Sequence, residues 1–213
     1  MPARTTAPHH IRPSKSALFA AAKAWDFKAV AALLHVAPEL VRATDPKGRM
    51  ALHIACAAQA KRKDDPNGLK TVAALLKAGA GLEDIVPMDE DEGDFRANPL
   101  WYAVARGENL PLVRFLIQRG ADASFSLWAA VWRDDATLCR ALLAARPRLN
   151  LRAHGETPLF YAARLQRLKT LALLIEAGAD PAIADDRGRD AVAIARARRL
   201  PKEIIARLER AKR

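Results

Sequence analysis

A helix-starting pattern of small and apolar residues recurs six times along the chain. Its clearest copy is TPLFYAA, residues 157–163, in which the Thr157 hydroxyl can cap a helix and Pro158 suits the first helical turn. The third residues of successive copies are separated by 34, 48, 27, 32 and 33 residues. This period near 33 residues, with two disturbances, predicts a chain of structural repeats. The other copies are SALFAAA from Ser16, MALHIAC from Met50, NPLWYAV from Asn98, FSLWAAV from Phe125 and DAVAIAR from Asp190.

Each repeat also contains a second apolar cluster and a stop signal. The clusters are VAALL at Val30, VAALL at Val72, VRFLI at Val113, CRALL at Cys139, LALLI at Leu171 and IIARL at Ile204. Three of them lead into AGAG, RGAD or AGAD, where glycine can adopt the left-handed conformation that ends a helix. Pro38 and Pro147 end the second helix in the first and fourth repeats. Because TDPKGR from Thr44 and ADDRGR from Ala184 favour tight turns, the unit is turn, helix, helix.

Taken together, these elements resemble the ankyrin repeat. The resemblance rests on TPLFYAA, ALHIACA, the LLxxGA helix ending and the DxxGR turns, and it covers about residues 14–210. It implies an all-α solenoid whose stacked units share one core and present a concave surface. We expect a disordered head at residues 1–13 and a repeat domain at 14–213. Its six units are predicted at about residues 14–45, 46–82, 96–122, 123–151, 152–184 and 185–213.

Two segments depart from the regular unit. The seven residues from Gly120 to Leu127 are too few for the usual projecting finger, which we expect to be missing there. Residues 83–95 form an acidic insertion with seven carboxylates between Glu83 and Asp94. Their spacing does not match a calcium-binding loop of the EF-hand type. We expect a solvated loop, and the sharper hypothesis is that it binds basic surfaces of this chain or of a partner.

The resemblance implies where a partner protein would bind. Ankyrin repeat proteins hold partners with their turn tips and with the exposed side of the first helix in each unit. Most residues at the matching positions are basic, which predicts a positive concave groove; a solvated face of a basic protein is the equal alternative. The partner-binding residues predicted in this way are Lys23, Lys47, Arg49, Gln59, Arg106, Trp132, Arg133, His154, Glu156, Arg164, Arg187 and Arg189.

Aromatic residues recur at one position of the first helices. They occupy the place that His53 has in the second copy, and we expect them to pack between successive units rather than to contact a ligand. Trp132 differs because it falls on an exposed position beside Arg133, and such pairs are typical of binding anchors. The residues at the repeated position are Phe19, Trp101, Trp128 and Phe160.

Much of the formal net charge of +11 lies at the C-terminal end. Residues 196–213 hold eight Lys and Arg against two Glu. We interpret this segment as a capping helix, in which Ile204, Ile205 and Leu208 face inward while charged residues keep the end of the array in water. The alternative is a surface for nucleic acid or anionic membranes.

The sequence lacks the short motifs of enzymes and cofactor sites. It contains no Gly-rich phosphate loop, no GxSxG, no HExxH and no serine or cysteine with an evident histidine base, so we expect no catalysis, cofactor or metal. Cys56 and Cys139 lie in apolar helix patterns without metal-ligand spacing and are interpreted as buried free thiols. Without a long apolar run or a secretory signal, we expect a soluble cytoplasmic protein, with delivery into a host cell left open.

We therefore expect a monomeric, non-catalytic module that binds a partner protein of unknown identity through its concave face and turn tips. The alternative is binding to nucleic acid or to an anionic surface, which would be broad and sensitive to salt.

Overall fold

A computed structural model of the protein describes residues 12–59, 65–86 and 96–213. Within these residues the secondary structure is helical, and pairing between extended segments is limited to three isolated β-bridges. The expectations for the head and for the carboxylates from Asp89 to Asp94 lie almost wholly outside the described residues.

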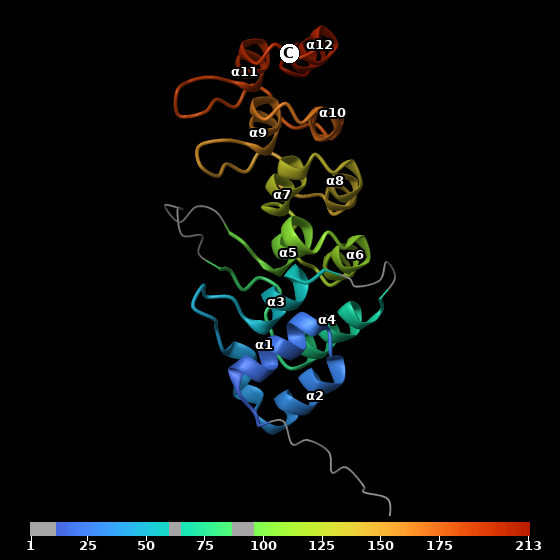
Figure 1. Cartoon of the computed structure of the whole chain (residues 1–213). Coiled ribbons are helices and arrows are strands. Elements are labelled where there is room, and N and C mark those ends of the chain that lie inside the picture. Colours follow the sequence, from blue (N-terminus) through green and yellow to red (C-terminus); the bar gives the residue numbers. More distant parts are fainter. Residues whose placement is uncertain (1–11, 60–64, 87–95) are drawn as a thin grey trace, which may run out of the picture.

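The helices of the described residues form pairs that stack from one end of the molecule to the other (Figure 1). The first helices of the pairs are α1 (Lys15–Ala24), α3 (Ala51–Ala57), α5 (Pro99–Tyr102) with the π-helical turn η2 (Ala103–Gly107), α7 (Ser126–Arg133), α9 (Pro158–Arg164) and α11 (Ala191–Ala197). The second helices are α2 (Phe27–Val36), α4 (Asn67–Lys77), α6 (Leu110–Gln118), α8 (Ala136–Leu143), α10 (Leu168–Glu176) and α12 (Lys202–Ala211). Each set forms its own column in Figure 1, and a 3-10 turn, η1 (Pro38–Arg42), follows α2. The predicted all-α solenoid is confirmed.

Local signals set the helix boundaries. The Thr157 hydroxyl accepts a hydrogen bond from the Phe160 amide, and the Asn98 side chain accepts one from the Trp101 amide. In the first unit the capping residue is Ser14 rather than Ser16, since its hydroxyl accepts from the Ala17 amide and α1 already begins at Lys15. At the other end of α4, Gly79 has a φ of +94°, as the glycine-alanine ending predicts.

One continuous core runs through the array. The leucine of each of the first five motif copies is almost fully buried, from Leu18 to Leu159. Trp101, Trp128 and Phe160 are buried as expected, whereas Phe19 is only half-buried because α1 has no unit before it among the described residues. Both cysteines are buried free thiols, and burial raises the pKa of Cys139 to about 12.

Hairpin-like fingers project beside the first helices (Figure 1). A β-bridge between Thr44 and Met50 closes the finger before α3, and the Ala153–Glu156 bridge closes the one before α9. The chain before α7 has no such bridge in the described residues and forms no projecting loop in Figure 1, which fits the expected loss of a finger; the finger before α11 projects without a bridge. There Asp122 instead accepts hydrogen bonds from the amide and hydroxyl of Ser124.

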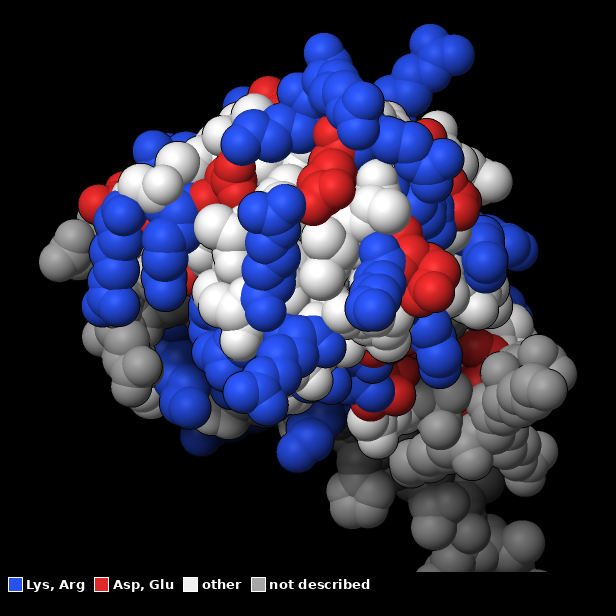
Figure 2. Space-filling model, turned by 90° about the horizontal axis from the view of Figure 1, so that it is seen from above, with Lys and Arg blue, Asp and Glu red and all other residues white. Residues whose placement is uncertain are grey.

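The last helix, α12, caps the array. Leu208 is buried, and Ile204 and Ile205 pack against the core, as expected for a capping helix. Seen from this end, Lys and Arg side chains ring the surface, with fewer acidic groups between them (Figure 2). Two of these cations hold the cap in place, since Arg207 contacts Glu176 and Lys212 contacts Asp190.

Candidate functional site

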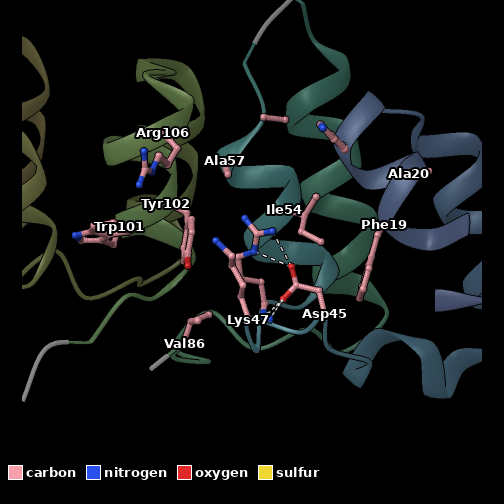
Figure 3. A pocket seen from close by; sticks show the side chains of 13 residues that line it. Phe19, Ala20, Asp45, Lys47, Ile54, Ala57, Val86, Trp101, Tyr102 and Arg106 are labelled. Atoms are coloured by element: carbon pink, nitrogen blue, oxygen red, sulfur yellow. Dashed lines mark hydrogen bonds and ion pairs between the residues drawn. The ribbon is translucent and has the colours of Figure 1, made fainter. Parts of the chain in front are cut away.

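A groove of about 790 Å³ opens on the side where the fingers and first helices meet. Its walls are the finger of residues 45–49, the helices α1 and α3, and the α5–η2 segment (Figure 3). In Figure 3, Phe19, Ile54 and Tyr102 follow one another along the groove from α1 to α5. The groove therefore spans the first three units and belongs to the concave face of the array.

Positive charge dominates the groove. Its lining contains four cationic side chains, Lys23, Lys47, Arg49 and Arg106, against the single carboxylate of Asp45. Lys23, Lys47 and Arg106 are exposed, and within the described part of the chain none of the three has an ion-pair partner. Among the described residues, no carboxylate would have to be displaced before these three side chains bind an anionic ligand.

The finger that forms one wall is held by Asp45 and Arg49. One oxygen of Asp45 accepts hydrogen bonds of 2.9 Å from the amides of Lys47 and Arg49, and the other contacts the Arg49 guanidinium at 2.7 and 2.8 Å. Partial burial raises the pKa of Asp45, but the hydrogen bonds and charge of Arg49 outweigh this effect and hold the pKa below its usual value. Arg49 thus stabilises the finger, and Lys47 remains at its tip.

The same finger geometry recurs near the C-terminal end. One oxygen of Asp185 accepts from the amides of Arg187 and Arg189, and the other contacts the Arg189 guanidinium at 2.6 Å. These hydrogen bonds from Arg189 lower the pKa of Asp185. The DxxGR sequence therefore fixes the shape of the finger, and in both places its final arginine is paired with the aspartate.

A π-helical turn, η2, distinguishes the third unit. Nine residues separate Pro99 from Glu108, the left-handed residue that ends the helix, whereas eight separate Pro158 from the corresponding Gln166. The wider turn absorbs the extra residue. Arg106 consequently stands two residues before the left-handed position, as Lys23, Trp132 and Arg164 do in their units.

Close backbone packing fixes this turn against α3. A side-chain carbon added at Gly107 would overlap the carbonyl oxygen of Cys56, so only glycine fits without a shift of backbone. The Gln59 side chain donates a 3.3 Å hydrogen bond to the Arg106 carbonyl oxygen. Gln59 therefore connects the second and third units at the edge of the groove.

His53 has a structural role beneath the groove. It is fully buried; its Nδ1 accepts from the Met50 amide at 3.2 Å, and its Nε2 lies 2.8 Å from the Asp84 carbonyl oxygen. Nε2 therefore carries the proton and donates to that oxygen. Burial lowers the pKa of His53, and Tyr102 packs edge-on against its ring.

The first residue of the acidic insertion, Glu83, is exposed but also makes hydrogen bonds within the protein. Glu83 accepts hydrogen bonds from the Asn98 side chain at 3.0 Å and from the Asp122 amide at 2.8 Å. Its carboxylate thereby links the insertion to both ends of the third unit. Asp84 accepts a hydrogen bond from the Gly81 amide, so the described start of this insertion stabilises a turn.

The remaining predicted partner-binding residues lie outside the groove. Arg133 contacts Glu108 at 2.5 Å, and Arg164 contacts Glu156 at 2.8 Å. Trp132 is 49% exposed on α7. His154 and Arg187 are exposed at finger tips. The structure thus brings together four of the predicted residues, Lys23, Lys47, Arg49 and Arg106.

Sequence reasoning missed the apolar part of the groove. Phe19 and Ile54 are half-buried side chains that line it, and Val86 closes its lower edge in Figure 3. The exposed apolar surface of Phe19 could have been predicted from its place in the first unit, because no earlier motif copy precedes it to cover its side chain.

Two searches of the described residues bear on other kinds of site. No group of three or more His, Cys, Asp or Glu side chains is arranged to hold a metal ion in this part of the chain. None of the described helices is both long and apolar enough to cross a membrane.

Comparison with known proteins agrees with the repeat geometry. A family model described as ankyrin repeats in three copies matches residues 67–185, more than half of the chain. The chain belongs to the ankyrin repeat family. A search of curated proteins found no match to this ankyrin repeat protein.

Solved ankyrin repeat structures superpose on nearly the whole chain. A domain from Acinetobacter baumannii AYE does so with a TM-score of 0.71 and 26% identity, over 93% of this chain and 98% of that one. The human ASB11 domain gives 0.68 and 23%, over 92% and 83% of the two chains. The domain of Bcl-3, an IkappaB family member, gives 0.61 and 21%, over 91% and 97%. The last two establish the fold alone.

Proposed function

We propose that this ankyrin repeat protein is a non-catalytic interaction module that binds a partner protein in the groove of its first three units. The observation that carries the proposal is the position of Lys23, Lys47 and Arg106 around a groove with a partly apolar floor. Ankyrin repeat proteins hold their partners with turn tips and first helices, which are the elements that line this groove. Two buried free thiols fit a reducing compartment, so we place the interaction in the cytoplasm. We further propose that the protein binds as a monomer.

Nucleic acid or an anionic surface is the second candidate ligand. The ring of Lys and Arg side chains around the C-terminal end favours it (Figure 2). Three of the eight cations of residues 196–213 contact carboxylates within the protein, and the other five have no ion pair among the described residues; the paired ones are Arg196, Arg207 and Lys212. We favour the groove because apolar side chains lie beside its cations.

Affinity capture with three forms of the protein tests the proposal. The groove variant carries Lys23→Glu, Lys47→Glu and Arg106→Glu. The control variant carries Lys28→Glu, Arg114→Glu and Arg140→Glu, which change the same charge on exposed positions of second helices. Nuclease-treated lysate is applied at about 0.1 M and about 0.5 M salt, because screening strengthens between these values.

A protein that binds the wild type and the control variant at both salts, but not the groove variant, supports the proposal. Equal capture by all three forms would reject it. Nucleic acid retained without nuclease and lost at high salt would favour the second candidate.

A further inference from the structure

The groove combines two kinds of contact that a ligand must match. Lys47 on the finger, Lys23 on α1 and Arg106 on η2 supply positive charge from three different elements. Ile54 and Phe19 supply half-buried apolar surface from α3 and α1. A ligand that bears only negative charge would leave this apolar surface in water, and a purely apolar ligand would leave the cations unused.

Three cations of the groove differ in availability from three arginines of the later units. Arg133, Arg164 and Arg189 each contact a carboxylate at 2.5 to 2.8 Å, so an acidic ligand would have to displace a group already in place. Lys23, Lys47 and Arg106 have no such partner among the described residues. Carboxylates therefore gain most at the N-terminal end of the concave face.

The size of the groove restricts the ligand further. Its volume of about 790 Å³ lies within the range of about 300–1,000 Å³ that holds drug-sized ligands, which suits a few side chains of an extended peptide. A nucleic-acid duplex would instead need a long track of phosphate contacts.

We propose that the groove binds an extended acidic segment of the partner protein, with carboxylates on both sides of an apolar side chain. The carboxylates contact Lys47 on one side and Arg106 and Lys23 on the other, and the apolar side chain packs against Ile54 and Phe19. This inference rests on the proposed function, because it names the chemistry of the partner in the same groove.

Fluorescence anisotropy with a labelled peptide tests the inference. The probe is fluorescein-labelled Gly-Glu-Asp-Phe-Glu-Asp-Gly, and three further probes accompany it: the same peptide with amides in place of carboxylates, the same peptide with Gly in place of Phe, and an oligothymidylate of similar charge. We expect micromolar binding of the acidic peptide. Removing the carboxylates should abolish binding, and removing the Phe side chain should weaken it by about threefold or more.

Single charge reversals locate the bound peptide. We expect Lys47→Glu and Arg106→Glu each to weaken binding by about tenfold, and Lys28→Glu and Arg140→Glu to change it by less than about twofold. All four residues have exposed side chains, and circular dichroism with thermal unfolding confirms that each variant is folded. Equal loss in groove and control variants would overturn the assignment to this groove.

The outcomes separate this inference from the proposed function. Suppose that the acidic peptide does not bind, but a cellular protein is captured by the wild type and the control variant and not by the groove variant. The acidic-segment inference is then wrong, and the proposal of a protein-binding module is retained. If the oligothymidylate binds more tightly than the peptide and responds to the same charge reversals, the inference is overturned in favour of a nucleic-acid site. If neither probe binds and no captured protein depends on the groove, both proposals fail.

Discussion

The two fingers with the sequence DxxGR have the same internal geometry but different surroundings. Asp45 holds Arg49 as Asp185 holds Arg189, with matching amide and guanidinium contacts. Beside the first finger lie Lys23 and Arg106, which have no ion-pair partners in the described residues, whereas beside the second finger Arg152 of the preceding unit contacts Asp186 at 2.5 Å. A repeated sequence therefore sets the shape of a finger, and neighbouring side chains decide whether its charge is available.

The first helices repeat this contrast. Two residues before the left-handed turn, Lys23 and Arg106 are unpaired among the described residues, while Arg164 at the same position contacts Glu156. Equivalent positions in an ankyrin array thus have different tasks. The cations at this position in the first and third units have no ion pair among the described residues, whereas the one in the fifth unit holds a carboxylate of its own finger.

The largest expected effect concerns the π-helical turn η2, which among the described units occurs only in the third unit, beside the groove. Gly107→Ala should lower the free energy of unfolding by about 2–3 kcal/mol, because the new methyl group overlaps backbone that cannot move freely. Urea unfolding followed by circular dichroism measures the change. Gly79→Ala is the control: it meets no atom within 4 Å but is strained by its positive φ, so we expect a loss of about 1 kcal/mol. Equal losses in the two variants would show that the close approach of Gly107 to the Cys56 carbonyl oxygen does not affect the free energy of unfolding.

A pH-dependent effect should follow from His53. Burial lowers the pKa of this histidine, so its neutral form is favoured in the folded protein. Its contribution to stability is present above the unfolded pKa of about 6.5 and is lost as the pH falls below that value, by at most about 1.4 kcal/mol per pH unit for one proton. Urea unfolding at several pH values between about 7.5 and 5 measures the slope. His53→Gln should remove this part of the slope, and an unchanged slope would contradict the assignment.

A smaller effect on stability should distinguish two arginines at the same position of the first helices, Arg164 and Arg106. Truncating Arg164 to Ala should cost about 0.5–1 kcal/mol, because a partly buried ion pair with Glu156 is lost. Arg106→Ala should change stability by less than about 0.5 kcal/mol, since its side chain is exposed and unpaired among the described residues. Thermal unfolding of both variants, together with Glu156→Ala and the Arg164/Glu156 double variant, gives the coupling energy directly. A greater loss for Arg106 than for Arg164 would reverse the comparison.

The smallest expected effect is a titration shift in the fingers. Asp45 and Asp185 should titrate below the unfolded value of about 3.9, because Arg49 and Arg189 stabilise their carboxylates. Their contribution to stability is present above that value and is lost as the pH falls through the folded pKa. Carbon-detected NMR of the carboxyl groups measures both midpoints. Asp45→Asn should also weaken binding of the acidic peptide by about threefold, because the first finger forms one wall of the groove, while Asp185→Asn leaves binding unchanged. Equal effects of the two substitutions on binding would show that the shape of the first finger is not important for the groove.

Much of the fold could be predicted from local signals. The caps at Thr157 and Asn98, the glycine at position 79 and the leucines of the motif copies all have the expected roles. The cap of α1 is Ser14, two residues before the motif copy that begins at Ser16, and only the hydrogen bond from the Ala17 amide distinguishes the two serines. Likewise, nothing local showed that Glu83 would bind groups that lie 15 and 39 residues away.

The candidate site was predictable in type but not in extent. Basic residues at the exposed repeat positions were visible in the sequence, and four of them do line one groove. Their partners were not visible, because Glu108 lies 25 residues from Arg133 and reaches it from the preceding unit.

The sequence by itself determined the repeat register, the helix ends and the buried positions, since capping, turn geometry and apolar periodicity act over a few residues. Only the tertiary structure decided which cations are paired and where the groove opens, since ion pairing depends on side chains that stacking brings together from different units.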